Sequence, residues 1–215
     1  MNTAISKVAD PEVRTHLYEN VAGLMRFAYE QQGVRALEST RRIAAVHEAG
    51  HGVVYEATAD GVRWWRAYRL RIWRVNEIPG VNFWGGETTV SPKAPPEHVD
   101  TRIDPAGTAI LAMRALAGWT AEQLFTDDFR LGSSLDEVTI AGGCAKRLAH
   151  HWMKSPEECF AMLFSMTREI LKANAVCALR IADRLEFSRR IDSPDLRRLL
   201  ADVKVMTRDN LVLDC

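Results

Sequence analysis

The sequence has no long run of apolar residues and no excess of charge of either sign. Its longest apolar stretch, residues 106–119, contains Arg114 and is shorter than the roughly 20 residues of a membrane-spanning helix. The 28 Lys and Arg residues balance the 28 Asp and Glu residues, so no global charge attracts nucleic acid or an anionic surface. We therefore expect a protein that has no membrane span and does not bind nucleic acid.

Cysteine is scarce and shows no metal-binding spacing. The four cysteines form no CxxC pair: Cys144, Cys159, Cys177 and Cys215. This pattern favours reduced thiols over a disulfide framework or a cysteine-based zinc site. Residues 1–20 lack the apolar core of a secretory signal, and we expect a cytoplasmic protein.

Hydrophobic periodicity predicts helices around one small sheet. Apolar residues recur at helical spacing over residues 41–59 and from residue 105 onward. Residues 66–91 between them alternate apolar and polar side chains, are rich in aromatic residues, and predict a small sheet. We expect a mainly α-helical α+β fold, with residues 1–38 as an N-terminal helical extension and residues 39–215 as the main domain.

Capping residues predict where two helices begin. Ser39 or Thr40 is placed to cap the helix that starts at Arg41. Pro156 suits the first turn of a later helix. Near the end of the sequence, the periodicity over residues 166–190 predicts one long helix.

Residues 47–51 read HEAGH, with two histidines four residues apart and a glutamate directly after the first. Residues four apart on an α-helix share one face, so His47 and His51 can present ring nitrogens to one zinc ion. Glu48 lies one step round the helix, where it can act as a general base on a water at the metal. The alternative is a pair of histidines that share a helix without a metal. The small residues Ala49 and Gly50 and the apolar flanks favour the metal site.

The segment HEAGHGVV, residues 47–54, resembles the protease domain of the FtsH family of ATP-dependent zinc proteases. Three later segments are similar to that family's small-residue helix, its glycine-containing zinc-ligand segment and its C-terminal helical hairpin: residues 115–125, 131–148 and 168–200. The resemblance covers roughly residues 40–200 in order. It implies an FtsH-protease-like helical core with a small sheet beside the HExxH helix, and the activity of a zinc metalloendopeptidase.

A catalytic zinc ion needs a third protein ligand. By the resemblance this ligand is Asp136, in the first turn of a helix that Ser133 or Ser134 can cap. The helix dipole alone would also favour an acidic residue there. Glu122 is the alternative ligand, because a downstream helix glutamate completes other HExxH proteases. If Asp136 is the ligand, Glu122 is placed to orient a ligand histidine.

The resemblance is incomplete, because these 215 residues contain no P-loop, Walker B acid or arginine finger. We therefore expect a stand-alone peptidase that hydrolyses peptide bonds in peptides or unfolded proteins. In it, Zn²⁺ would be held by His47, His51 and Asp136, and Glu48 would be the general base. Two alternatives stay open: a peptidase subunit that needs a separate ATPase or forms a homo-oligomer, and a catalytically weak binding or regulatory protein with this fold.

Residues 81–90, VNFWGGETTV, suggest how a substrate could bind. They are typical of a short strand at the edge of a sheet, on which an extended peptide could pair. Gly85 and Gly86 would let that peptide approach closely. The alternative for the glycine pair is an ordinary bulge or turn.

Overall fold

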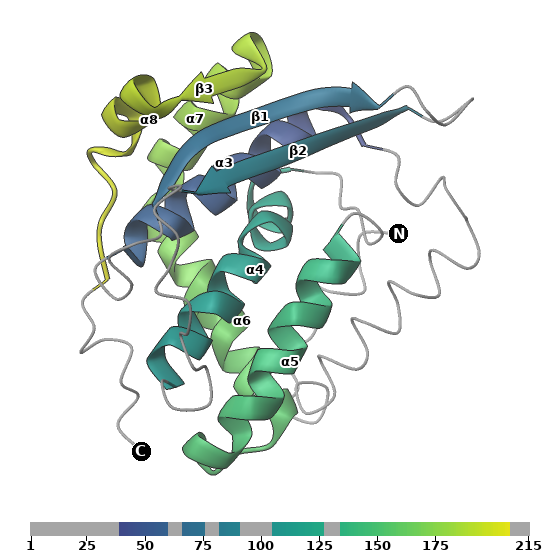
Figure 1. Ribbon diagram of the computed structural model, residues 1–215, viewed down its shortest axis with the longest axis vertical. Coiled ribbons are helices and arrows are strands. Elements are labelled where there is room, and N and C mark those ends of the chain that lie inside the picture. Colours follow the sequence, from purple (N-terminus) through teal and green to yellow (C-terminus); the bar gives the residue numbers. More distant parts are fainter. Residues whose placement is uncertain (1–38, 60–65, 76–81, 91–104, 127–133, 207–215) are drawn as a thin grey trace.

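Helix α3 (Arg41–Ala57) packs against both a small β-sheet and several other helices (Figure 1). The computed structural model describes residues 39–59, 66–75, 82–90, 105–126 and 134–206. Within these ranges the chain is mainly helical with one antiparallel sheet, which confirms the expected fold class. The proposed extension, residues 1–38, lies outside the described residues.

The sheet has the strand order β2-β1-β3 and lies over α3. Its central strand β1 (Ala67–Val75) pairs antiparallel with β2 (Phe83–Val90) and with β3 (Arg190–Asp192). Leu70 and Ile72 are buried beneath the sheet, whereas Arg71 between them is exposed. The alternation that predicted a sheet within residues 66–91 is therefore present. The third strand was not predicted, because three residues carry no periodic pattern of their own.

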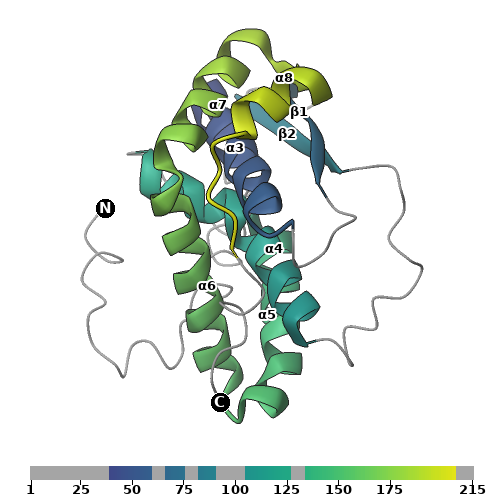
Figure 2. The same ribbon diagram turned by 90° about the vertical axis from the view of Figure 1, so that its left-hand side faces the viewer.

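Five more helices complete the described fold: α4 (Pro105–Phe125), α5 (Leu135–Trp152), α6 (Pro156–Ala173), α7 (Ala175–Ser188) and α8 (Ser193–Leu200). Helices α4, α5 and α6 pack against one another below α3, and Figure 2 shows α5 and α6 extending away from the sheet. Helix α7 packs against α3 on another side. No described helix combines the length and apolar character needed to cross a membrane.

The helix starts predicted at Thr40 and Pro156 are present. Thr40 caps α3, since its Oγ1 accepts a hydrogen bond of 3.2 Å from the Ile43 amide. Ser134 stands at the N-cap position of α5 but its side chain makes no capping hydrogen bond, and Ser133 lies outside the described residues.

The predicted long C-terminal helix is broken. Residues 166–190, expected as one helix, contain a break at Asn174 instead. The Asn174 side chain donates to the Ile170 carbonyl (2.9 Å) and accepts from the Lys204 amide (2.7 Å). A side chain that bonds the backbone in this way competes with helical hydrogen bonding, which explains the break.

Candidate metal centre

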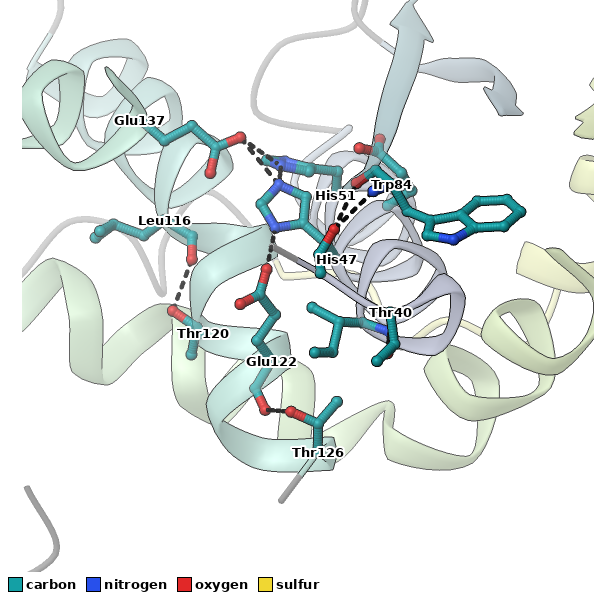
Figure 3. A network of polar contacts seen from close by, with 12 residues as sticks. Thr40, His47, His51, Trp84, Leu116, Thr120, Glu122, Thr126 and Glu137 are labelled. Atoms are coloured by element: carbon teal, nitrogen blue, oxygen red, sulfur yellow. Dashed lines mark hydrogen bonds and ion pairs between the residues drawn. The ribbon is translucent and has the colours of Figure 1, made fainter. Parts of the chain in front are cut away.

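His47 and His51 point the same way from α3, as their four-residue spacing predicts. Their Nε2 atoms lie 3.1 Å apart. Glu137, in the first turn of α5, places its Oε1 2.9 Å from the Nε2 of His51 and 3.2 Å from the Nε2 of His47 (Figure 3). Two imidazole nitrogens and one carboxylate oxygen therefore meet at a single point, and among the described residues they form a group that could hold a metal ion.

The size of this group suits a zinc ion. A tetrahedral zinc ion with ligand atoms at about 2.0–2.1 Å holds those atoms about 3.3 Å apart. The three separations here run from 2.9 to 3.2 Å, so the three atoms are spaced almost as ligands around one ion would be.

The other ring nitrogens determine which atoms of the histidines carry hydrogen. His51 Nδ1 lies 3.0 Å from the carbonyl oxygen of Arg114, which can only accept, so Nδ1 must donate. His47 Nδ1 lies 2.7 Å from Oε1 of Glu122, a residue of α4 that is 1% exposed. In neutral histidines, both Nε2 atoms then present lone pairs to each other and to Glu137.

Three acceptors that face one another repel unless a positive charge lies between them. The second oxygen of Glu137, Oε2, is buried and has no hydrogen-bond partner among the described residues. A cation at the centre would satisfy all of these atoms together. The residues present therefore fit a divalent metal ion.

Without a metal, a proton supplies the positive charge. Burial alone would lower the pKa of His47, but the carboxylates of Glu137 and Glu122 outweigh burial and raise this pKa well above its ordinary value. Burial would raise the pKa of Glu137, yet the two histidines outweigh it and hold this pKa far below its ordinary value. The centre is thus built to hold positive charge.

The structure brings Glu137, not the expected Asp136, against the histidines. Asp136 is exposed, on the side of α5 that also carries the exposed Ile140 and Arg147. One residue along a helix is a rotation of about 100°, which separates the two acidic side chains. We therefore replace Asp136 by Glu137 as the third candidate ligand. Helical spacing in the sequence could have indicated that Glu137 faces inward. It shares a helix face with buried residues of α5: Ala141, Cys144 and Leu148.

Glu122 lies where it can orient His47, the second of the two roles considered for it from the sequence. Its carboxylate binds the Nδ1 of His47, away from the point where the three acceptors meet. A carboxylate that holds the far nitrogen of a ligand histidine fixes the ring and increases its basicity. Gly118, one turn earlier on α4, was not predicted to matter, yet a Cβ there would collide with the His47 ring.

Glu48 is buried beside the centre and does not belong to the three-atom group. Its Oε2 accepts a hydrogen bond of 2.7 Å from the Thr88 hydroxyl. Burial raises the pKa of Glu48, although His47 and His51 act against this rise. Gly86 of β2 makes room for Glu48, since a Cβ at Gly86 would overlap its carboxylate. The sequence analysis expected Gly86 to let a peptide approach closely. In the structure, Gly86 also leaves space for the Glu48 side chain.

Two cavities meet at the centre and share Glu48, Gly86 and Glu137 as lining residues. One, of about 280 Å³, is mostly apolar away from the centre and includes Ile43, Trp73, Val75, Phe83 and Trp84. The other, of about 240 Å³, is more polar and adds His51, Tyr55, Glu87 and Thr88. A ligand that crosses the centre could therefore occupy both cavities.

A comparison with protein-family models finds none that matches the chain, and a comparison with curated proteins finds no match either.

Proposed function

We propose that this protein is a zinc-dependent metallopeptidase of the FtsH type, with the metal held by His47, His51 and Glu137. The observation that carries the proposal is that two imidazole nitrogens and one carboxylate oxygen lie within 3.2 Å of one another, beside a buried glutamate. Two imidazoles and one carboxylate form a donor set that zinc peptidases use. The HEAGH sequence, which resembles the FtsH family, supports the same conclusion.

A bound zinc ion would polarise the scissile carbonyl group and lower the pKa of a water molecule. The protein's own groups then handle the proton. Glu48 accepts it from the water whose oxygen bonds to the carbonyl carbon, and delivers it to the amine nitrogen when the C–N bond breaks. The burial that raises the pKa of Glu48 makes this carboxylate a stronger base than an exposed one. Thr88 holds one of its oxygens in place.

Among the described residues no strand pairs with the outer edge of β2, which supports an extended peptide as the substrate. The Ile72 amide donates to the Arg189 carbonyl (2.8 Å), on the side of β1 away from β2. In an antiparallel pair the backbone groups of the partner residue also point away, so those of Gly86 point to the outer edge of β2, away from β1. A peptide that pairs there would pass Glu48, which lies against Gly86.

One end of this edge is already occupied. The Ser39 hydroxyl donates to the Trp84 carbonyl (2.8 Å) and accepts from the Trp84 amide (2.9 Å). A substrate strand would therefore pair from Gly86 onward. Side chains of the substrate that reach past Trp84 would meet the apolar cavity, which favours apolar residues at that position.

The test is cleavage of an unstructured protein such as casein by zinc-loaded wild type and Glu48→Gln. The glutamine keeps the size of the side chain but cannot take a proton, so cleavage should fall on the order of 10²–10⁴-fold. Glu56→Gln is the matched control, because Glu56 lies on the same helix but pairs with Arg66 (3.1 Å) outside the centre. Zinc content should stay at one ion per chain in all three proteins.

The outcomes separate the proposed functions. Equal cleavage by wild type and Glu48→Gln would remove Glu48 as the base. Failure of zinc-loaded wild type to cleave any unstructured chain would favour a peptidase subunit that needs a separate ATPase, or a binding protein. The same cleavage assay with added ATPases from the source cell then distinguishes these two. Cleavage that appears only with an ATPase indicates a peptidase subunit, and continued absence of cleavage indicates a binding protein. A cytoplasmic location stays a prediction, and the free thiols of Cys144, Cys159 and Cys177 suit a reducing compartment.

A further inference from the structure

Tyr55 lies on α3 one turn after His51 and continues the face that carries both histidines. It is half-buried and lines the polar cavity together with Glu48, His51 and Glu137. Its hydroxyl makes no hydrogen bond to any part of the chain that the structure describes. A phenol without a partner, beside the candidate metal centre, is available to a ligand in that cavity.

Arg114 of α4 holds the ring of Tyr55. Its guanidinium carbon lies 4.4 Å from the ring centroid, and its Nε donates to the Thr58 hydroxyl (3.0 Å). Arg114 is 3% exposed, and its Nη2 has no acceptor among the described residues. Stacking of this kind fixes the ring plane, and a cation over the ring makes the phenol a stronger hydrogen-bond donor.

A buried arginine without a carboxylate partner is costly, and burial lowers the pKa of Arg114 to about 10. The described residues offer it neutral contacts only: the Thr58 hydroxyl and the Tyr55 ring. Its own carbonyl oxygen accepts from His51. The charge of Arg114 therefore lies against the ring of Tyr55, which lines the cavity beside the candidate metal centre.

We propose that the Tyr55 hydroxyl donates a hydrogen bond to the oxyanion that forms when water adds to the scissile carbonyl, and that Arg114 is the positioning residue for Tyr55. The inference rests on the proposed peptidase function. As the water oxygen bonds to the carbonyl carbon, the π electron pair moves to the carbonyl oxygen, and Tyr55 stabilises this charge without losing its proton. When the C–N bond breaks, the carbonyl re-forms and Glu48 protonates the amine.

The protonation of Tyr55 agrees with a donor role. Burial raises the pKa of Tyr55, and the nearby carboxylates of Glu137 and Glu48 raise it further, while Arg114 acts in the opposite direction. The phenol is therefore protonated at neutral pH, as a hydrogen-bond donor must be.

The first test is Tyr55→Phe, which keeps the ring and its stacking on Arg114 and removes the hydroxyl alone. With zinc-loaded protein and an unstructured peptide, kcat should fall on the order of 10²-fold, the usual effect of one oxyanion donor. Zinc content should stay within about threefold of wild type, because the hydroxyl makes no hydrogen bond to the candidate metal ligands. KM should change as little, because the proposed hydrogen bond forms in the transition state and not with the bound, uncleaved peptide. Tyr68→Phe is the matched control, since Tyr68 also lies under an arginine, Arg69 (5.3 Å), but on β1 and outside both cavities.

The second test measures binding. A phosphonamidate peptide carries a tetrahedral anion like the one expected on the substrate, and its affinity for Tyr55→Phe should fall by about the same factor as kcat. The affinity for the uncleaved substrate peptide is measured in Glu48→Gln, which does not cleave it. This affinity should be the same whether or not Tyr55→Phe is also present. Unchanged kcat and unchanged phosphonamidate affinity in Tyr55→Phe would overturn the inference while leaving the peptidase function intact.

The role of Arg114 is tested by a double-variant cycle. Arg114→Met should lower kcat in the wild-type background but have little further effect on kcat in Tyr55→Phe, because it acts through the phenol. Arg114→Lys, which keeps the charge, should recover part of the loss. Additive losses in the cycle would give Arg114 a structural role only. If wild type cleaves nothing, the peptidase function fails first, and equal phosphonamidate affinity in wild type and Tyr55→Phe then removes Tyr55 as well.

Discussion

Glu137→Gln and Asp136→Asn apply the same chemical change to neighbouring residues of α5. Each removes one negative charge and keeps the shape of the side chain, and both sit in the first turn, where the helix dipole acts on them alike. They differ in position, because Glu137 contacts His47 and His51 while Asp136 is exposed. The pair therefore separates the loss of a ligand from the loss of a charge.

The expected size of the effect follows from the number of ligands. Structural zinc sites with four ligands bind with about 10–16 kcal/mol, or roughly 2.5–4 kcal/mol per ligand. Loss of Glu137 should thus weaken zinc binding on the order of 10²–10³-fold. Asp136→Asn removes an exposed charge that solvent and salt screen, so its effect should stay below about threefold.

A proton partly offsets the loss in Glu137→Gln. In the metal-free wild type the raised pKa of His47 means that a proton must leave before zinc binds. The variant lacks the Glu137 charge that helps raise this pKa. Removing the His47 proton before zinc binds therefore takes less free energy in the variant than in wild type. Because the wild-type cost shrinks as pH rises, the measured difference between wild type and Glu137→Gln should grow from pH 6.5 toward pH 8.

The assay is competition for zinc against a chelator of known affinity, with circular dichroism to confirm that each variant is folded. Equal affinities for Glu137→Gln and Asp136→Asn would refute the assignment of Glu137. A larger loss in Asp136→Asn would return the role to Asp136 and show that α5 is rotated relative to this structure.

Two further predictions concern the surroundings of His47. Glu122→Ala should weaken zinc binding on the order of 10–100-fold, and Glu122→Gln less, since its carbonyl oxygen can still accept from His47 Nδ1; equal affinities across the series would show that this contact is dispensable. Zinc binding at pH 7 should release about one proton, because the raised pKa keeps metal-free His47 charged. Calorimetry in two buffers of different ionisation enthalpy measures this number, which should fall as pH rises through that pKa, and a value near zero at pH 7 would contradict it.

Features that depend on local rules could be predicted from the sequence. Thr40 caps α3 because a threonine oxygen suits an exposed amide. His47 and His51 meet because residues four apart share a helix face. Leu70 and Ile72 are buried because side chains of a strand alternate. Each of these depends on a few neighbouring residues and on no distant part of the chain.

Features that depend on how elements pack could not be predicted in the same way. The choice between Asp136 and Glu137 depends on the rotation of α5 against α3 and α4, and one residue changes it by about 100°. The break at Asn174 depends on Lys204, which lies 30 residues away along the chain. Strand β3 exists because Ile191 pairs with Leu70 across the fold.

Two facing helices connect the candidate metal centre to the proposed oxyanion donor. Each presents residues at four-residue spacing: His47, His51 and Tyr55 on α3, and Arg114, Gly118 and Glu122 on α4. The two stripes run in opposite directions, so that Glu122 holds His47 at one end and Arg114 holds both His51 and Tyr55 at the other. Contacts this close require small residues between the helices, and a Cβ at Gly50 would collide with α4. Equal spacing on both helices keeps the stripes in register over two turns, which is why one packing contact can position the ligands and the donor together.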